Sequence, residues 1–301
     1  MLSSETVTAV CNLRCSNHEP YLRVPDNQGG DSLLVRCQTC GLVFQEPRPE
    51  KQAIDAFYGS AALWTDSRDA EGHSRSYLAE LGAKRPFFRD LRRRIERHQR
   101  GGKLLDVGCG PGLLQQELDP SHWEVTGVEP SAFIAEYGRR NLRATILDGT
   151  LQSLGLPEAH YDVIVMKYVL DHMEEPFEAL VKARRLIKPG GVLVLADLIN
   201  IDSFCARFFR EGYRLIHPMH FTYFSPATIA GHLKRAGFRV TKIEYPFWNT
   251  PYATVSNLSR LLFRILQRGI KTLCGSSKRI FSVPFYGNMM DVWAVPAEES
   301  R

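Results

Sequence analysis

The stretch Leu104-Leu-Asp-Val-Gly-Cys-Gly-Pro-Gly112 decides which fold the whole chain is expected to adopt. An apolar run that ends in an acid and three alternate glycines predicts a buried strand followed by a tight turn. Glycine reaches positive φ without strain and lets a ligand approach the backbone closely. We therefore expect this stretch to bind a ligand where a strand ends.

The spacing of the glycines separates this stretch from two common nucleotide-binding loops. A dinucleotide fingerprint has the order G-x-G-x-x-G, whereas here the third glycine is Gly112 and Leu113 follows it. A Walker loop has Gly-Lys-Ser/Thr, which does not follow here. The order G-x-G-x-G after Asp106 resembles motif I of class I S-adenosylmethionine-dependent methyltransferases. The resemblance implies an α/β fold with a doubly wound, mostly parallel, seven-stranded sheet of the Rossmann-like type over residues 101–301.

Composition limits the class of protein. The 301 residues are 44% apolar and 24% charged, which suits one α/β domain with a smaller unit beside it. The N-terminus shows no signal-like apolar region, and no uncharged apolar run approaches the length of a membrane span, so we expect a cytoplasmic location. The net charge of +5 is modest and does not by itself indicate nucleic-acid binding.

Four of the seven cysteines lie within the first 40 residues, as the pairs Cys11 with Cys15 and Cys37 with Cys40. A C-x2-C pair followed by glycine is typical of a zinc ribbon, in which four thiolates form a tetrahedron. The first pair has the less usual C-x3-C spacing. In a reducing compartment metal ligation is favoured over disulfides. Four unligated cysteines are the alternative, and His18 is a conceivable substitute ligand.

The passage Gly41-Leu-Val-Phe-Gln-Glu-Pro-Arg-Pro49 resembles the ribbon-to-linker region of methyltransferases from bacterial glycan and natural-product pathways. The resemblance implies a zinc-ribbon-like segment over 1–48 that helps to cover the substrate side. We expect a helical linker or cap over 49–100, with a short helix at 50–58, a loop at 60–73 and a long basic helix from Ser74 to about Arg100. The basic helix is compatible with an RNA-facing patch, but a solvated helix face is favoured.

An acid at the end of the second strand completes the cofactor prediction. Glu129 lies 23 positions after Asp106, which fits one βαβ step. The resemblance implies that Glu129 binds both ribose hydroxyls and that Asp106 orients the ammonium group of the cofactor. The other residues predicted to bind cofactor are Gly108, Cys109, Gly110, Gly112, Pro130, Asp148, Gly149, Thr150 and Lys167.

Three later passages also resemble this family. They are Val169-Leu-Asp-His172, Leu186-Ile-Lys-Pro-Gly-Gly191 and His217-Pro-Met-His-Phe-Thr-Tyr-Phe-Ser225, the last being similar to a His-x-x-x-Phe-Ser passage of glycan-associated members. His220 is the candidate general base and His172 the second catalytic candidate, since a neutral imidazole accepts a proton from a hydroxyl near neutral pH. A histidine hydrogen-bonded within its own loop is the alternative.

An amphipathic insertion is expected at about 251–285. Seven apolar residues from Leu258 to Leu273 share one helical face, and four basic residues from Arg260 to Lys271 take the opposite one. Such a helix can lie on an anionic membrane. It can equally pack on the enzyme, or on a second subunit through residues 256–273, with its arginines in water, and this packed arrangement is favoured.

These observations predict methyl transfer from S-adenosylmethionine to a small-molecule acceptor, which is either free or lipid-linked, with nucleic acid a less favoured partner. The ribbon-like segment favours a sugar, nucleotide-sugar or glycan precursor, by resemblance. Three alternatives stay open: a quinone- or lipid-type O-methyltransferase at a membrane surface, an RNA methyltransferase, and a cofactor-binding interaction protein without catalysis. Zn²⁺ is the second predicted cofactor.

Overall fold

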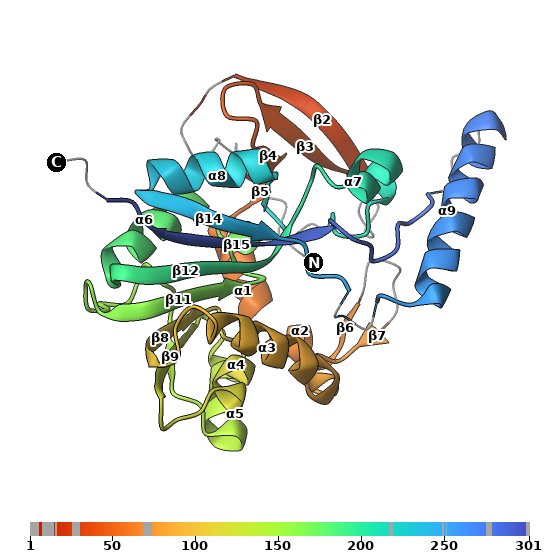
Figure 1. Ribbon diagram of the computed structural model, residues 1–301. Coiled ribbons are helices and arrows are strands. Elements are labelled where there is room, and N and C mark those ends of the chain that lie inside the picture. The colour runs from red at the N-terminus through yellow and green to blue at the C-terminus, as the bar shows by residue number, and fades with distance from the viewer. Residues whose placement is uncertain are drawn as a thin grey trace.

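The computed structural model describes residues 6–7, 15, 17–25, 31–68, 74–216, 219–248, 250, 252–274 and 279–298. Within these residues the main sheet has seven strands in the order β10-β9-β8-β11-β12-β15-β14 (Figure 1). The strands are β8 (Gly102–Val107), β9 (Trp123–Glu129), β10 (Ile146–Asp148), β11 (Tyr161–Lys167), β12 (Ile187–Ile199), β14 (Phe238–Glu244) and β15 (Met289–Pro296). β15 runs antiparallel to its neighbours β12 and β14, whereas the pairs from β10 to β12 are parallel. The predicted doubly wound, mostly parallel seven-stranded α/β sheet is therefore confirmed.

Helices cover both faces of this sheet because its strands are apolar on both sides. Leu104 and Val163 pack with α3 (Leu81–Ile95) and α4 (Leu113–Glu117) on one face. Their chain neighbours Leu105 and Ile164 pack with α6 (Pro176–Leu186) and α8 (Pro226–Arg235) on the other. Alternate residues of a strand point to opposite faces, so a continuous apolar run serves two layers of helix. A further helix, α5 (Ala132–Leu142), contacts β9 and β10.

The cysteine-bearing segment forms a second, antiparallel sheet with strand order β13-β4-β3-β2. Its strands are β2 (His18–Pro25), β3 (Asp31–Cys37), β4 (Val43–Glu46) and β13 (Thr222–Tyr223). The short β1 (Thr6–Val7) pairs with β5 (Arg48–Pro49). Because β13 comes from the chain beyond β12, the N-terminal segment is joined to the main domain through a shared sheet.

The cap over residues 49–100 differs in part from expectation. The predicted short helix is α1 (Lys51–Gly59). The predicted loop at 60–73 instead contains α2 (Ala61–Thr65) and β6 (Ser67–Arg68), which pairs with β7 (Ser74–Arg75); residues 69–73 lie outside the described residues. The predicted basic helix is shorter, since its first two residues belong to β7 and turns flank α3 on both sides.

The remaining elements follow β12. They are η1 (Leu170–His172) before α6, then α7 (Phe204–Phe209), η2 (Arg210–Gly212) and the long α9 (Val255–Cys274), which stands at the edge of the molecule (Figure 1). The expected packing of α9 on the enzyme through its apolar face is found only in part. Leu261 is buried and Ile265 packs against the same cluster, whereas Leu262 and Leu266 are exposed, and Arg268 and Lys271 pair with Glu211 instead of lying in water. None of the helices in the described ranges has the length and apolar character required to cross a bilayer.

Candidate functional site

A cavity of about 820 Å³ lies where β8, β9 and β11 end, and the cap forms its other wall. The strand ends and the turns that follow them contribute Gly108, Glu129, Pro130, Gly149, Thr150, Leu151, Tyr168 and His172, and the cap contributes Lys51, Tyr58, Trp64, Arg75, Tyr77 and Lys84. Ligands of open α/β sheets bind at this edge, outside the carboxyl ends of the strands. The volume is within the range of small-molecule sites, roughly 300 to 1,000 Å³.

The glycine loop forms one wall of the cavity. Gly108 has φ +67°, and a Cβ atom there would lie 2.4 Å from Cγ2 of Val169, so no larger residue fits. Gly110 has φ +54°, but the atoms nearest to a Cβ there belong to Trp64 and Tyr77 and are 3.9 Å away. The backbone at Gly110 is therefore open toward the cap aromatics, as expected for a loop that a ligand approaches closely.

Glu129 lies at the end of β9 and holds this loop. Its two carboxylate oxygens accept hydrogen bonds from the backbone N–H groups of Gly110 and Ser131, each at 2.9 Å. Burial raises the pKa of Glu129 to about 7, although the two backbone hydrogen bonds act to lower it. Burial, together with the Glu129 carboxylate, raises the pKa of Asp106 to about 7, and Lys167 acts to lower it. Two carboxyl groups that ionise near neutral pH thus stand on the neighbouring strands β8 and β9.

Ser131 has a role that the sequence did not predict. It occupies the N-cap position of α5, where a serine side chain usually accepts from the helix backbone, but its hydroxyl makes no such bond. Instead Oγ accepts a hydrogen bond from Nε1 of Trp64 at 3.1 Å. Trp64 also lies edge-on to Tyr77, with ring centroids 5.2 Å apart. The cap is therefore fastened to the cofactor half of the cavity.

The other predicted cofactor residues divide into two groups. Pro130, Gly149 and Thr150 line the cavity, and the Thr150 hydroxyl accepts from the backbone N–H of Ser153 at 3.1 Å. Three others lie behind the loop or away from it. The Cys109 side chain packs against Gly127, Gly112 lies against Ala144, and Asp148 is exposed and paired with Arg139 at 2.8 Å.

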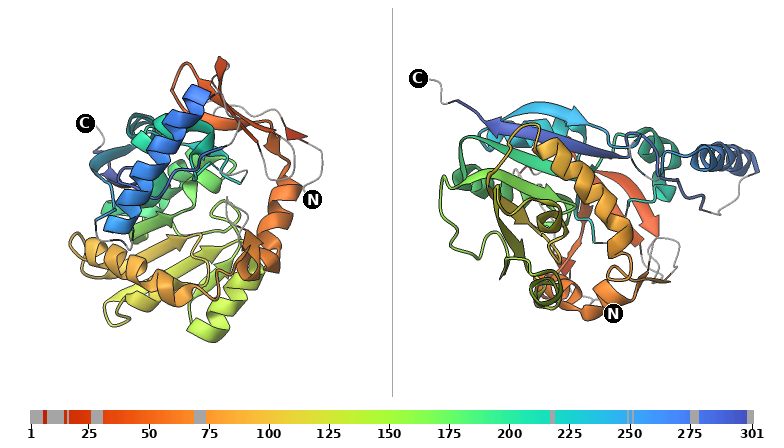
Figure 2. Two further views of the ribbon diagram at one scale, coloured as in Figure 1. Left: turned by 90° about the vertical axis from the view of Figure 1, so that its right-hand side faces the viewer. Right: turned by 60° about the horizontal axis from the view of Figure 1, so that its bottom comes forward.

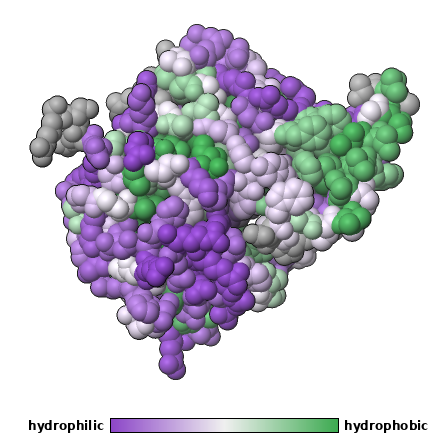
Figure 3. Space-filling model, viewed as in Figure 1, coloured by the Kyte–Doolittle hydropathy of each residue, from purple (hydrophilic) through white to green (hydrophobic). Residues whose placement is uncertain are grey.

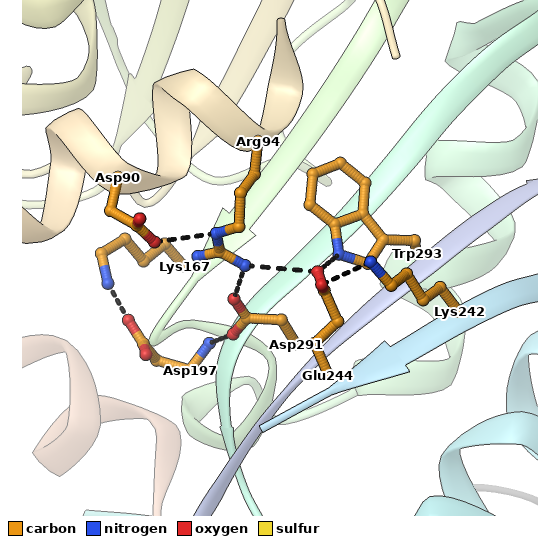
Figure 4. Close-up of polar contacts among 8 residues, drawn as sticks. All are labelled: Asp90, Arg94, Lys167, Asp197, Lys242, Glu244, Asp291 and Trp293. Carbon is orange, nitrogen blue, oxygen red and sulfur yellow. Dashed lines mark hydrogen bonds and ion pairs between the residues drawn. The ribbon is translucent and has the colours of Figure 1, made fainter. Parts of the chain in front are cut away.

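Lys167, the remaining predicted cofactor residue, points into a buried ion network between α3 and the sheet (Figure 4). Its ammonium group donates to Asp197, and the Asp197 backbone N–H donates to Asp291 at 2.7 Å. Arg94 pairs with Asp291 and is bonded to Asp90 at 2.9 Å. Burial lowers the pKa of Lys167 to about 8. The residues that line the cavity do not include this lysine.

The two predicted catalytic histidines lie together although 48 positions separate them in the sequence. The ring centroids of His172 and His220 are 4.3 Å apart. Nδ1–H of His220 donates to the carbonyl oxygen of Leu215 at 2.8 Å. Nδ1 of His172 contacts the Met219 carbonyl oxygen at 2.9 Å and the Tyr58 hydroxyl at 2.7 Å. Since a carbonyl oxygen only accepts, Nδ1 carries the hydrogen in both rings, and Nε2 is the basic atom. His217 lies outside the described residues.

Asp171 joins the histidines and was not predicted as a site residue. Its carboxylate is fully buried, and within the described chain neither oxygen has a hydrogen-bond partner. One donor atom from each of Asp171, His172 and His220 lies within 4.8 Å of the others. Burial raises the pKa of Asp171, and His220 acts to lower it. The signal in the sequence was the acid that directly precedes His172.

The cysteines form a separate cluster in the N-terminal sheet. The sulfur atoms of Cys15, Cys37 and Cys40 lie within 4.8 Å of one another, and all three are thiols rather than disulfides. The backbone N–H of Cys40 donates to Sγ of Cys37 at 3.5 Å, in a turn completed by Gly41 at φ +76°. A tetrahedral zinc ion with Zn–S bonds of about 2.3 Å requires sulfurs roughly 3.8 Å apart. The three thiols therefore fit three corners of such a site.

Two details concern the predicted fourth ligand. Cys11 lies outside the described residues, so its place as a ligand stays a prediction. His18, the conceivable substitute, directs Nε2 at the Cys15 carbonyl oxygen, 2.8 Å away, and its ring stands edge-on to Phe44.

Comparisons with known proteins place the chain among methyltransferases. A family model described as a methyltransferase domain matches residues 75–243, more than half of the chain. An uncharacterized methyltransferase of Anoxybacillus flavithermus is 36% identical over 155 residues, which are 50% of this chain and 68% of that protein. A mitochondrial ubiquinone biosynthesis O-methyltransferase of Schizosaccharomyces pombe is 29% identical over 154 residues, which are 48% of this chain and 54% of that protein.

Among solved structures, magnesium protoporphyrin IX methyltransferase from Synechocystis with bound SAH has a TM-score of 0.52 at 16% identity. The match covers 82% of this chain and 100% of that one, and it concerns the fold. The matched region spans between 33% and 68% of the length of the first curated relatives.

Proposed function

Because the chain belongs to the methyltransferase-domain family, we propose that it transfers a methyl group from S-adenosylmethionine to a small-molecule acceptor. The observation that supports this most directly is the cavity, which a glycine loop, a strand-end carboxylate and His172 line, with His220 next to His172. One wall suits a nucleoside with an amino-acid tail. The opposite wall suits a proton-bearing acceptor.

The half of the cavity formed by the glycine loop and Glu129 suits S-adenosylmethionine. S-adenosylmethionine, when bound, supplies an electrophilic methyl group on a positively charged sulfonium. Gly108 and Gly110 give the backbone approach, and Glu129 has acceptor capacity beyond the two N–H bonds it already makes, as two ribose hydroxyls require. Gly149 and Thr150 lie on the wall where the adenine would rest. Ionised Glu129 and Asp106 favour a cationic ligand.

The acceptor half holds groups that can orient a nucleophile and take its proton. Tyr58 and His172 line the cavity and are hydrogen-bonded to each other. The ring of His220 lies against that of His172. We assign His220 as the general base and His172 as the second catalytic histidine, on the cavity wall, with Nε2 as the basic atom of each. The buried Asp171 carboxyl group lies beside both rings; burial raises its pKa, and His220 acts to lower it.

A sugar, nucleotide-sugar or glycan precursor is the acceptor class we propose first. The support is the resemblance of the cysteine-rich segment and of the 217–225 passage to glycan-associated methyltransferases. Sugar hydroxyls are weak acids, so a base beside the acceptor has most effect for that class.

A quinone- or lipid-type O-methyltransferase is the second candidate. Ubiquinone biosynthesis O-methyltransferases are among the relatives, at 28% and 29% identity. The exposed apolar face of α9 also favours a hydrophobic or lipid-linked acceptor.

RNA is a weaker candidate because the basic helix is largely neutralised. In α3, Arg85 and Arg89 both pair with Glu117 at 2.7 and 3.2 Å, and Arg94 pairs with Asp90. Few of its cations therefore remain to release counterions from a phosphate backbone.

We also propose that the cysteine cluster binds Zn²⁺ through Cys15, Cys37 and Cys40, with Cys11 as the fourth ligand. The support is the mutual proximity of the three thiols and the amide hydrogen bond to Cys37. Its role is structural, since a site closed by four protein ligands leaves no position for substrate.

Two measurements test the function. Calorimetry with S-adenosylmethionine should show saturable binding, and the absence of heat at about 1 mM cofactor, where even a weak site would respond, would exclude this function. A screen of labelled methyl transfer into sugar-nucleotide, quinone and RNA pools then identifies the acceptor. Cofactor binding without transfer to any pool would favour the non-catalytic interaction protein.

Variants test the assigned base. His220→Gln should lower kcat about 100-fold or more while cofactor affinity is retained, since a general base contributes roughly 10²- to 10⁴-fold. The exposed His122 gives the matched control, and His122→Gln should leave kcat unchanged. Equal activity of the two variants would remove His220 from the mechanism.

A further inference from the structure

The way in which α9 packs on the enzyme leaves most of the apolar side of this amphipathic helix exposed. On the side facing the enzyme, Leu261 is buried and Asn257 donates to the Pro284 carbonyl oxygen at 2.5 Å. Arg268 and Lys271 pair with Glu211 at 3.1 and 3.6 Å. Two of the four basic side chains are thus used to hold the helix against η2. Only Leu261 and Ile265 of the apolar face pack inward, so most of that face remains in water.

The outward side is an apolar stripe that runs the whole length of the helix. Its residues are between 50% and 88% exposed, and they are Val255, Leu258, Leu262, Phe263, Leu266, Ile270 and Leu273. Twenty residues of helix span about 30 Å. Figure 3 shows a continuous hydrophobic area over α9, and the right-hand view of Figure 2 shows the helix standing apart from the main sheet. A contiguous apolar patch of this size marks an interaction site.

The charge around the stripe indicates what it contacts. No Asp or Glu occurs between Tyr245 and Met290, whereas Arg260, Arg264, Lys278 and Arg279 occur there beyond the two cations paired with Glu211. An interfacial helix on an anionic bilayer has this composition: apolar residues on one side, basic residues on the polar side and no acid.

The same charge argues against a second copy of the chain as the occupant. Neither copy has an acid between Tyr245 and Met290, so two copies packed stripe to stripe would place two basic, acid-free segments next to each other. Like charges across an interface cost free energy rather than adding to affinity.

The position of α9 relates the stripe to the candidate site. The helix is inserted between the end of β14 and the start of β15, which is the edge of the sheet where the cavity lies. Tyr168, which lines the cavity, donates to Sδ of Met289 at 3.0 Å, at the first residue of β15. A surface bound by α9 is therefore on the cavity side of the molecule.

We propose that α9 docks the protein on an anionic membrane surface, with the stripe inserted at the level of the lipid headgroups and the cations of the acid-free segment attracted to the anionic lipid. The docking itself is argued from α9 alone, and its role in catalysis rests on the proposed methyltransferase function. It makes the membrane the place where a lipid-linked or quinone-type acceptor meets the cavity.

Vesicle flotation with the whole chain tests the proposal. The probes are phosphatidylcholine vesicles and vesicles with half the lipid replaced by phosphatidylglycerol. The chain should bind the anionic vesicles at least about 10-fold more tightly, and binding should weaken as ionic strength rises from about 0.05 to 0.5 M, because salt screens exposed charges. Failure to float with anionic vesicles, or equal binding to both kinds, would overturn the proposal.

Two double variants distinguish the contribution of the apolar stripe to vesicle binding from that of the basic residues. Leu262→Gln with Leu266→Gln leaves the charge unchanged and should reduce vesicle binding about 10-fold or more. Arg260→Glu with Arg264→Glu should abolish the preference for anionic lipid. Arg93→Glu with Arg97→Glu makes the same charge change on exposed arginines of α3 and the turn after it, and should reduce vesicle binding far less.

Two further measurements complete the test. Sedimentation of the lipid-free chain tests whether a second copy covers the stripe instead. If the chain is a dimer, if Leu262→Gln with Leu266→Gln dissociates it, and if it does not bind vesicles, then the stripe is a dimer interface. Calorimetry with S-adenosylmethionine on the same preparations keeps the two proposals apart. A chain that binds cofactor but no vesicle refutes the docking alone, and one that binds vesicles but no cofactor refutes the methyltransferase function alone.

Discussion

At the residue scale, the chemistry of the cofactor half depends on two carboxyl groups held away from water. Glu129 and Asp106 are both almost completely buried, and burial raises the pKa of each to about 7. An acid whose pKa is higher in the folded protein than in the unfolded chain stabilises the fold most at low pH. That stability is lost as pH rises from near the unfolded value, 4.5 for Glu129, through the folded value near 7.

We therefore predict that the cofactor-free protein becomes less stable between pH 5.5 and 7.5, and that Glu129→Gln removes part of this dependence. The part that belongs to Glu129 should be about 1 to 2 kcal/mol in the free energy of unfolding. The affinity for S-adenosylmethionine should change in the opposite direction, rising with pH, because the ionised carboxylate is the form that accepts from ribose hydroxyls and attracts a cation. Urea unfolding and calorimetry at both pH values measure the two quantities.

Glu124 provides the matched control. It lies on β9 as well, but it is exposed and paired with Lys103 at 3.3 Å. Glu124→Gln should leave both pH dependences unchanged. If Glu129→Gln unfolds with the same pH dependence as the wild type, then Glu129 does not titrate in this window and its carboxylate is ionised throughout.

Short-range sequence patterns predicted some residues of the candidate cofactor site and not others. Gly108, Gly110 and Glu129 were identifiable because loop geometry and one βαβ step are short-range properties of the chain. Tyr77 and Trp64 complete the cavity from the cap, and the spacing of the sequence gives no reason for Tyr77 to face Gly110. Lys167 was placed with the cofactor because it ends β11, but its partner Asp197 becomes its neighbour only when the sheet is assembled.

At the element scale, α3 is fixed to the far edge of the sheet by one side chain. Arg94 pairs with Asp291 of β15 and lies 3.7 Å from Glu244 of β14 (Figure 4). Asp291 is fully buried, and burial raises its pKa while Arg94 acts to lower it. Removal of one partner from a buried ion pair leaves the other charge without compensation, which costs about 3 to 5 kcal/mol.

We accordingly predict that Arg94→Met lowers the free energy of unfolding by about 3 kcal/mol. Arg93→Met, at the exposed position next to it, should change that free energy by less than about 0.5 kcal/mol. Urea unfolding of the two variants gives the comparison. Similar small losses in both would mean that Lys167 alone compensates the Asp291 charge.

The elements also show why the orientation of α9 could not be obtained from the sequence. Its periodicity defines an apolar face and a basic face, but amphipathicity does not say which of the two meets the enzyme. Glu211 decides this, because it is the acid that receives Arg268 and Lys271, and it lies 57 and 60 positions earlier in the chain. The strands of the main sheet were predictable, since each is a buried apolar run bounded by turn residues.

At the scale of the whole molecule, a series of backbone hydrogen bonds between neighbouring strands connects the cysteine cluster to the candidate catalytic residues. Cys37 ends β3, which pairs with β4, and β4 pairs in turn with β13. The Gln45 N–H of β4 donates to the carbonyl oxygen of Phe221, and the Phe221 N–H donates to the carbonyl oxygen of Asp171, both at 2.9 Å. Asp171 directly precedes His172. Whatever holds the cysteine turn therefore also supports the segment that carries both histidines.

If Zn²⁺ closes that turn, its removal should loosen residues 43–46 and 219–224 together, because metal-binding free energy becomes folding free energy in a small metal-bound unit. We predict at least about 10-fold faster amide exchange at Gln45 and Phe221 after chelation or in Cys40→Ser, while β9 exchanges as before, since stability is not uniform across a structure. Hydrogen exchange with mass spectrometry measures this, alongside the zinc content of the purified chain. Loss of zinc with unchanged protection at Phe221 would mean that the sheet holds the catalytic segment without the metal. A purified chain that contains no zinc and takes none up would instead mean that β13 alone, by completing the sheet, joins the N-terminal segment to the site.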